Sequence, residues 1–406
     1  MALATISPPS ETQKSRVALR GIACESDSIV TVPLVEERAF AQWQQDIPRE
    51  YWALGADELT ARIAAAREKL GTRLVILGHH YQREDIIQFA DFRGDSFKLA
   101  RWAAERPESE YIVFCGVHFM AEAADILSAP HQKVMLPNMA AGCSMADMAD
   151  PDDVYSAWAE LEELGIARDT LPITYMNSAA SLKAFVGEHG GAVCTSSNAK
   201  KVLAWAFEQK KRVLFFPDQH LGRNTGYAMG IPLDEMVLWG WARPYGSMGG
   251  RTLEELERSR IILWAGHCSV HQRFTPLQIA EARAKYPDIT VIVHPECRWE
   301  TVQASDLNGS TEFITKTIAE APSGAKFAVG TEINLVSRLA KENPDKLVFC
   351  LDPVVCPCST MYRVHPAYLA WTVESLAEGR IVNQVVVPEA IAAQARVALE
   401  RMLSIP

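Results

Sequence analysis

The sequence of 406 residues lacks any long apolar run, and no stretch approaches the roughly 18 residues that a membrane-spanning helix needs. Its first residues (MALATISPPSETQKSR) lack the apolar core of an export signal, so we expect a cytoplasmic protein without a membrane partner. Positive charge is also scarce, because 40 Lys and Arg face 50 Asp and Glu and leave a net charge of −10. An acidic chain binds nucleic-acid phosphates poorly, so no nucleic-acid partner is expected.

Cysteine is sparse too, with nine residues, and no two of them form a C-x-x-C pair. The common zinc patterns and the bacterial ferredoxin run are therefore excluded, as is a disulfide scaffold. Thiols in a cytosolic protein stay reduced. The cysteines are thus expected to be core residues, nucleophiles or metal ligands.

Short apolar runs that end at polar or glycine positions predict ten strands, at 73–77, 111–115, 133–136, 173–176, 192–194, 212–216, 260–264, 289–293, 326–329 and 346–350. They are apolar throughout, as in parallel sheets buried on both faces. Helical periodicity covers 57–70, 331–342 and 389–403. Strands alternating with helices indicate an α/β fold. Residues 221–258 show no clean period.

Polar triplets follow three of the predicted strands, and hydroxyl residues and cysteines follow the triplets at repeating distances. The triplets begin at His79, Tyr175 and His294, the hydroxyls are Ser96, Ser196 and Thr311, and the cysteines are Cys143, Cys268 and Cys358. In the first and third sets the hydroxyl lies 17 residues and the cysteine 64 residues after the triplet starts. The middle set has longer spacings, of 21 and 93 residues. The pattern favours three tandem α/β units.

Three such units around a pseudo-threefold axis would direct the carboxyl ends of their strands at one cavity. The hydroxyls would then lie at helix N-termini that bind carboxylate or phosphate, although each alone could be an ordinary N-cap. Three thiolates, one from each unit, would hold an iron–sulfur cluster with one iron free of protein ligands. That iron would act as a Lewis acid.

Several other residues remain candidates. Cys356 lies two residues before Cys358 and competes with it as the third ligand. His271 lies beside a candidate ligand, and Glu296 follows a proline at a strand end, where it could serve as a general acid or base. Cys297 could lie near the site.

The residues that carry these features resemble the quinolinate synthase family. The matching stretches are GHHYQREDI, ADFRGDS, VFCGVHFMAEAADIL, LPNMAAGCSMADM, TYMNSAA, VCTSSNA, FFPDQHLGRNTG, GHCSVH, VHPEC, GSTEFI, VGTEINLVSRL and CSTMYRVHPAYL. They follow one another in order from about residue 73 to about 385, which is three quarters of the chain. The ordered set is highly specific.

The resemblance implies three tandem αβα-sandwich domains with short parallel sheets around a pseudo-threefold axis. We expect an N-terminal extension and helix at 1–70, domains at 71–165, 166–285 and 286–375, and a C-terminal strand and helix at 376–406. It also implies a [4Fe-4S] cluster bound by Cys143, Cys268 and Cys358. The implied substrate-binding residues are His79, Ser96, Tyr175, Met176, Asn177, Ser196, His294, Pro295, Glu296 and Thr311, and the catalytic residues are His79, Tyr81 and Glu296.

The implied activity is that of a transferase of NAD biosynthesis. It condenses iminoaspartate with dihydroxyacetone phosphate to quinolinate, phosphate and two waters, and L-aspartate oxidase is the expected supplier of iminoaspartate. Two other functions stay open at this point. One is another iron–sulfur hydro-lyase that acts on a hydroxy acid, and the other is a non-enzymatic redox sensor.

Overall fold

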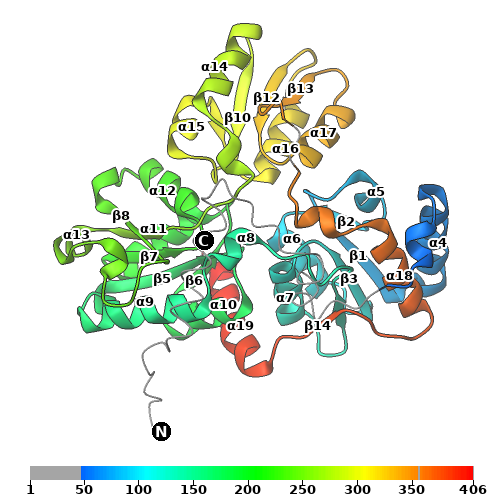
Figure 1. Ribbon diagram of the computed structural model, residues 1–406, viewed down its shortest axis with the longest axis horizontal. Helices are drawn as coiled ribbons and strands as arrows, with labels where there is room; N and C mark the ends of the chain where they lie inside the picture. Colours follow the sequence, from blue (N-terminus) through cyan, green and yellow to red (C-terminus); the bar gives the residue numbers. More distant parts are fainter. Residues whose placement is uncertain (1–46, 355–356, 406) are drawn as a thin grey trace.

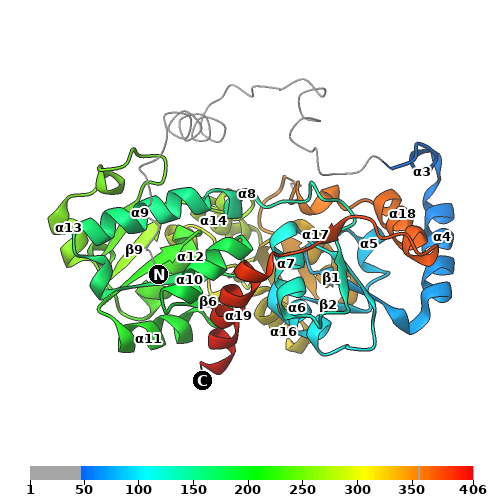
Figure 2. The ribbon, with the colours of Figure 1, turned by 90° about the horizontal axis from the view of Figure 1, so that it is seen from below.

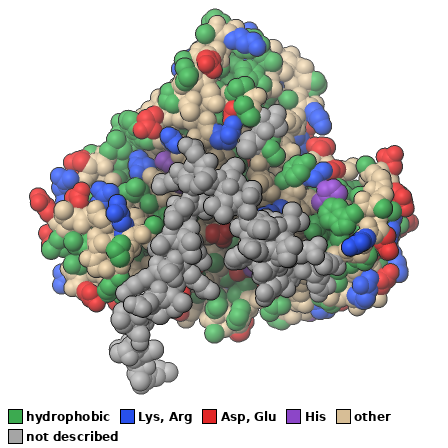
Figure 3. All heavy atoms as spheres, viewed as in Figure 1, with side chains coloured by type: hydrophobic (Ala, Val, Ile, Leu, Met, Phe, Trp, Pro, Cys, Tyr) green, Lys and Arg blue, Asp and Glu red, His purple; other side chains and the backbone are tan. Residues whose placement is uncertain are grey.

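The computed structural model describes residues 47–354 and 357–405, apart from the side chains of residues 97 and 104. Three separate β-sheets lie in three lobes that surround a common centre (Figure 1). Seen from below, the lobes form a broad, flat body (Figure 2). Charged side chains of both signs are scattered over the visible face (Figure 3).

The first sheet has the order β14-β4-β3-β1-β2 and is parallel except where β14 pairs with β4. Its strands are β1 (Leu74–His79), β2 (Phe92–Gly94), β3 (Tyr111–Cys115), β4 (Lys133–Met135) and β14 (Gln384–Val385). The second sheet, β6-β5-β7-β9-β8, is parallel throughout. It contains β5 (Thr170–Tyr175), β6 (Ala192–Cys194), β7 (Arg212–Phe216), β8 (Met236–Trp239) and β9 (Ile261–Trp264).

The third sheet, β11-β10-β12-β13, is also parallel. Its strands are β10 (Thr290–Val293), β11 (Leu307–Asn308), β12 (Lys326–Gly330) and β13 (Leu347–Cys350). In the first sheet β1 lies between β2 and β3, and β4 lies beyond β3. The second sheet repeats this arrangement with β5 between β6 and β7 and β9 beyond β7, and the third repeats it with β10 between β11 and β12 and β13 beyond β12. The first strand is therefore the switch point of each sheet, where α/β proteins bind ligands.

Helices connect the strands and cover the sheets. They are α3 (Glu50–Ala53), α4 (Ala56–Leu70), α5 (Glu84–Ile87), α6 (Ser96–Ala104), α7 (His118–Leu127), α8 (Ser144–Asp147), α9 (Pro151–Glu163), α10 (Ala180–Glu188), α11 (Ala199–Gln209), α12 (Gln219–Ala228), α13 (Leu253–Arg258), α14 (Pro276–Lys285), α15 (Trp299–Ala304), α16 (Thr311–Glu320), α17 (Ile333–Glu342), α18 (Pro366–Ala377) and α19 (Glu389–Ser404). Because parallel strands need crossover connections, these helices follow from the strand order. None of the described helices is long and apolar enough to cross a membrane.

The third sheet shows why its strands are apolar throughout. Val291 and Val293 of β10 join the hydrophobic cluster on one face, while Ile292 joins the cluster on the other face. Side chains alternate between the two faces of a strand, so both faces need apolar residues when helices cover both. Here α14 and α15 lie on one side of the sheet and α16 and α17 on the other (Figure 1).

The elements that follow the third lobe in the chain pack on the first two lobes. Tyr51 and Arg62 both donate hydrogen bonds to Glu374, which links α3 and α4 to α18. Further along, β14 completes the first sheet, and α19 then packs against α10 beside the second sheet. Gly187 of α10 allows this close approach, because a Cβ there would lie 2.1 Å from the Gln394 carbonyl oxygen.

The α/β fold with short parallel sheets is confirmed, and each of the ten predicted strands is present. The domain boundaries at 1–70, 71–165, 166–285, 286–375 and 376–406 stay predictions. Residues 221–258 are more regular than their sequence indicated, because they contain most of α12, all of β8 and all of α13. They add a fifth strand to the second sheet.

Candidate functional site

A small cavity of about 80 Å³ lies where the carboxyl ends of the three sheets meet. Its polar and sulfur-bearing lining comes from all three lobes and comprises His79, Tyr81, Asp95, Ser96, Met120, Cys143, Met145, Tyr175, Asn177, Ser196, Cys268, His294, Glu296, Thr311, Cys358, Thr360 and Met361. The structure thus brings most of the residues that the sequence singled out into one place.

The polar triplets reach the cavity because each follows a switch-point strand. His79 ends β1, Tyr175 ends β5, and His294 comes directly after β10. Met176 and Pro295 are also buried, but they are not among the residues that line the cavity. Their expected role in substrate binding stays a prediction.

Two of the three hydroxyls begin helices, as predicted. Ser96 is the first residue of α6 and Thr311 the first of α16, where Asp95 and Ser310 are the N-caps. Ser196 differs, because α11 begins only at Ala199. Ser196 lies instead in the preceding turn, in which the side chain of Asn198 accepts hydrogen bonds from Thr195.

The three cysteines lie in the loops that follow β4, β9 and β13. Their sulfur atoms share one cavity, and each thiol lies within electrostatic range of the others. Burial raises the pKa of all three thiols. A cationic group would be needed to hold them as thiolates. Cys356, the rival ligand, and Cys24 lie outside the described residues.

Buried carboxylates lie beside two of these loops. Glu332, the N-cap of α17, accepts a hydrogen bond from the backbone N–H of Cys358 at 3.2 Å. Asp218, the N-cap of α12, lies beside the loop of Cys268, and the next residue, Gln219, donates its backbone N–H to Gly266 O in that loop at 3.0 Å. The loop of Cys143 is held differently, since His118 N donates to Ala141 O at 2.8 Å and Arg363 donates to Ala140 O at 2.9 Å.

The spacing of the ligands distinguishes two kinds of metal centre. Within the described residues, the group of metal-ligating atoms that all lie within 4.8 Å of one another is Cys268, His271 and Glu296. Such a group could hold one metal ion. Cys143 and Cys358 are outside it, although they line the same cavity. Three thiols that face one space but are too far apart for a single ion fit a larger group such as an iron–sulfur cluster.

Glu296 is at the centre of the hydrogen bonds around the cavity. Its Oε2 lies 2.8 Å from His271 Nδ1, and Tyr175 also donates to it. Burial alone would raise the pKa of this carboxyl, but His271 and His294 outweigh that and lower the pKa to about 2. The two imidazole rings stack at 4.5 Å. Glu296 is therefore an ionised carboxylate enclosed by donors.

Burial keeps the histidines and tyrosines of the cavity neutral. Burial lowers the pKa of His79 well below its usual value, and it lowers the pKa of His294 to about 3. Burial, assisted by the charge of Glu296, raises the pKa of Tyr81 and Tyr175. Neutral imidazoles and phenols beside one carboxylate can accept and donate protons in turn.

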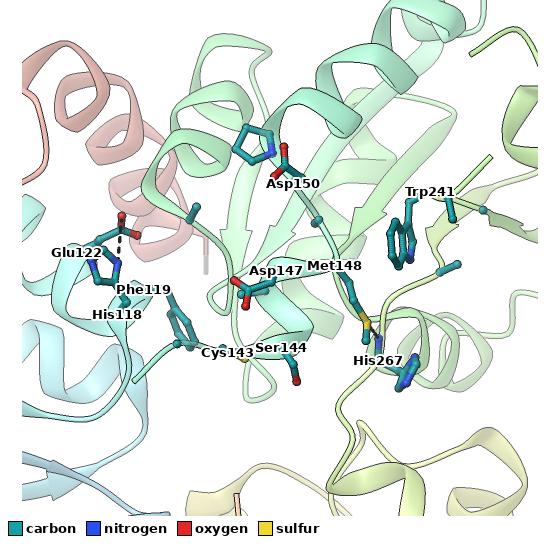
Figure 4. A pocket seen from close by; sticks show the side chains of 18 residues that line it. His118, Phe119, Glu122, Cys143, Ser144, Asp147, Met148, Asp150, Trp241 and His267 are labelled. Atoms are coloured by element: carbon teal, nitrogen blue, oxygen red, sulfur yellow. Dashed lines mark hydrogen bonds and ion pairs between the residues drawn. The ribbon is translucent and has the colours of Figure 1, made fainter. Parts of the chain in front are cut away.

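A second cavity of about 640 Å³ adjoins the first, and the two share Phe119 and Cys143. Figure 4 shows His118 and Glu122 on one side of it and Trp241 and His267 on the other, with Asp147 between them. It is larger, but none of the three polar triplets contributes to its lining. The smaller cavity is therefore the better candidate for chemistry.

Sequence reasoning missed Thr331, which comes directly after β12 and is fully buried. Its hydroxyl lies 2.8 Å from Tyr81 Oη and 3.1 Å from His271 Nε2. The one signal was a polar residue after a strand end, in the same context as the triplets. Phe119, Met145, Thr360 and Met361 of the cavity wall were also not foreseen.

Comparison with known proteins identifies the family of the chain. Residues 61–404 match the family model described as Quinolinate synthetase A protein. A quinolinate synthase of Corynebacterium glutamicum is 60% identical over 367 residues, which is 90% of this chain and 92% of that protein. One from Streptomyces coelicolor is 55% identical over 86% of this chain and 89% of its own length. One from Geobacillus sp. strain WCH70 is 54% identical over 89% of this chain and 97% of its own length. The chain belongs to the quinolinate synthetase A family.

Proposed function

We propose that this protein is a quinolinate synthase, a transferase that works in the cytoplasm. It would condense iminoaspartate with dihydroxyacetone phosphate to quinolinate, phosphate and two waters. The observation that carries the proposal is the convergence of three thiols and three strand-end polar groups on one cavity, in a chain of this family. L-aspartate oxidase is the partner expected to supply iminoaspartate.

The cofactor of the proposal is a [4Fe-4S] cluster with Cys143, Cys268 and Cys358 as its protein ligands. Bound there, it would supply an iron without a protein thiolate, a Lewis acid that polarises a carbonyl or assists loss of a hydroxyl. The three thiols fit this group because they line the same cavity yet do not form a single-ion site. Glu332 would keep one of the ligand loops in place.

The substrates are anions, and the cavity offers matching groups. Ser96 and Thr311 would bind carboxylate or phosphate oxygens with the N-termini of α6 and α16 behind them. Ser196 would add a hydroxyl from the turn before α11. Asn177 and Tyr175 would orient the forming ring, and Met176, His294 and Pro295 complete the proposed binding residues.

Proton transfer falls to three groups around the cavity. His79 and Tyr81 lie side by side, with ring centroids 4.9 Å apart, and Tyr81 N donates to His79 Nδ1 at 3.1 Å. Because both are neutral, the imidazole can accept a proton and the phenol can donate one. Glu296 would take up and return protons at its carboxylate, with His271 and Tyr175 fixing its direction.

The test is an assay of anaerobically purified protein with iminoaspartate and dihydroxyacetone phosphate, followed by identification of the product. Quinolinate, formed in step with phosphate release, is the expected result. Protein with full iron content that forms no quinolinate would contradict the proposal. Turnover of a hydroxy acid alone would favour the hydro-lyase instead.

A further inference from the structure

Tyr81 brings its phenol to the cavity from the loop after β1, and its backbone is firmly held from the third lobe. Arg338 donates to the carbonyls of His80 and Gln82, and Asn334 Nδ2 donates to the carbonyl of Tyr81 at 3.4 Å. Arg338 is buried. These contacts fix the loop, but they leave the direction of the phenol open, because none of them reaches its oxygen.

Among the described residues, two polar groups contact the phenol oxygen. Thr331 Oγ1 lies 2.8 Å from Tyr81 Oη, whereas His271 Nε2 is 3.4 Å away. Thr331 Oγ1 also lies 3.1 Å from His271 Nε2. Thr331 Oγ1 therefore lies closer to Tyr81 Oη and to His271 Nε2 than these two atoms lie to each other, so the hydroxyl bridges the two rings.

The imidazole is fixed from its other side. His271 Nδ1 lies 2.8 Å from Glu296 Oε2, and a carboxylate only accepts, so Nδ1 donates. A neutral ring accepts at Nε2 from Thr331 and leaves the oxygen of Thr331 to accept from the phenol of Tyr81, whereas a protonated ring reverses both bonds. In either state Thr331 connects the two rings. One hydroxyl thus connects groups that follow β1, β9 and β12, one from each sheet.

Thr331 and His271 are not among the residues that line the cavity, while Tyr81 is. Both are almost completely buried, with exposed fractions of 0% and 1%. An effect of Thr331 on substrate must therefore pass through Tyr81, or through His271 to Glu296.

We propose that Thr331 is a positioning residue, whose hydroxyl joins His271 to Tyr81 and holds the phenol of Tyr81 in its direction toward the substrate. The inference rests on the proposed function. Without the hydroxyl, the phenol keeps only the 3.4 Å contact with His271 and turns more freely. Since the substrate would still find its binding groups, kcat falls and KM stays nearly constant.

The test compares Thr331→Val, which keeps the shape, with Thr331→Ser, which keeps the hydroxyl. Thr301→Val is the matched control, because Thr301 is equally buried in the same lobe and its Oγ1 donates to Phe274 O at 2.8 Å. We expect kcat of Thr331→Val to fall about tenfold, with KM within about twofold and iron content unchanged. Thr331→Ser should recover most of kcat, and Thr301→Val should retain it.

Wild-type kcat in Thr331→Val would overturn the inference, as would equal losses in the Val and Ser variants or an equal loss in Thr301→Val. If Thr331→Val does not fold, Thr331→Ala replaces it, with the same expected fall in kcat, and wild-type kcat in that variant would overturn the inference in the same way. Failure of the proposed function looks different, because the wild-type protein with full iron content would then make no quinolinate.

Discussion

The two adjoining cavities share a wall of Phe119 and Cys143 and differ in what else faces them. The larger, of about 640 Å³, is lined by residues of the first and second lobes, including the exposed side chains of Ser144 and Asp147. The smaller, of about 80 Å³, receives buried His79, His294 and Glu296 and residues of all three sheets. The smaller cavity is the better candidate for catalysis because buried polar groups converge on it, even though the other cavity has the larger volume.

The largest expected effect lies in the smaller cavity, at Glu296. Glu296→Gln keeps the shape but removes a charge and one of the acceptors for His271 and Tyr175. We expect turnover to fall by about a hundredfold or more while iron and sulfide content persist. Steady-state rates and metal analysis measure both. Glu300→Gln is the control, because Glu300 is exposed at the start of α15. Unchanged turnover in Glu296→Gln would remove this carboxylate from the mechanism.

A matched pair of serines compares the cavities directly. Ser96 begins α6 in the smaller cavity, and Ser144 begins α8 in the larger. Ser96→Ala should raise KM for one of the anionic substrates about tenfold, because a hydrogen bond to a charged group is lost. Ser144→Ala should change KM by less than about twofold. Equal changes in the two variants would break the comparison.

The smallest effect on catalysis is expected at Asp150, which lines the larger cavity and caps α9 by accepting from Asp152 N. Asp150→Ala should lower the free energy of unfolding by about 1 kcal/mol, measured by denaturant titration, because an N-cap is lost. Turnover well below the unfolding transition should stay within about twofold. A fall in turnover as large as that of Glu296→Gln would give the larger cavity a part in catalysis.

The strands were predictable because they are buried on both faces. Residues 111–115, for example, read as one apolar run and coincide with β3. The strands missed were β2, β8 and β11, which have two to four residues and carry little pattern of their own. Their place comes from pairing with a neighbouring strand, β2 with β1, β8 with β9 and β11 with β10. β14 lies within 376–406, where a C-terminal strand is expected.

The cavity residues that directly follow a switch-point strand were predictable, because the carboxyl ends of these strands converge on one place. Thr331 was not, because its importance depends on partners 250 and 60 residues away, Tyr81 and His271. The anchors of the cysteine loops were hidden for the same reason. Glu332 reads as an ordinary helix N-cap, and only the fold shows that it also accepts from Cys358 N.

The most direct test of the account is the iron and sulfide content of anaerobically purified protein and of its Cys143→Ser, Cys268→Ser and Cys358→Ser variants. We expect about four irons and four sulfides for each wild-type chain and a large loss in every one of these variants. Cys115→Ala, which changes a buried cysteine of β3, should keep its iron. Full iron and sulfide in any of the three serine variants would contradict the claim that these thiols hold one shared group.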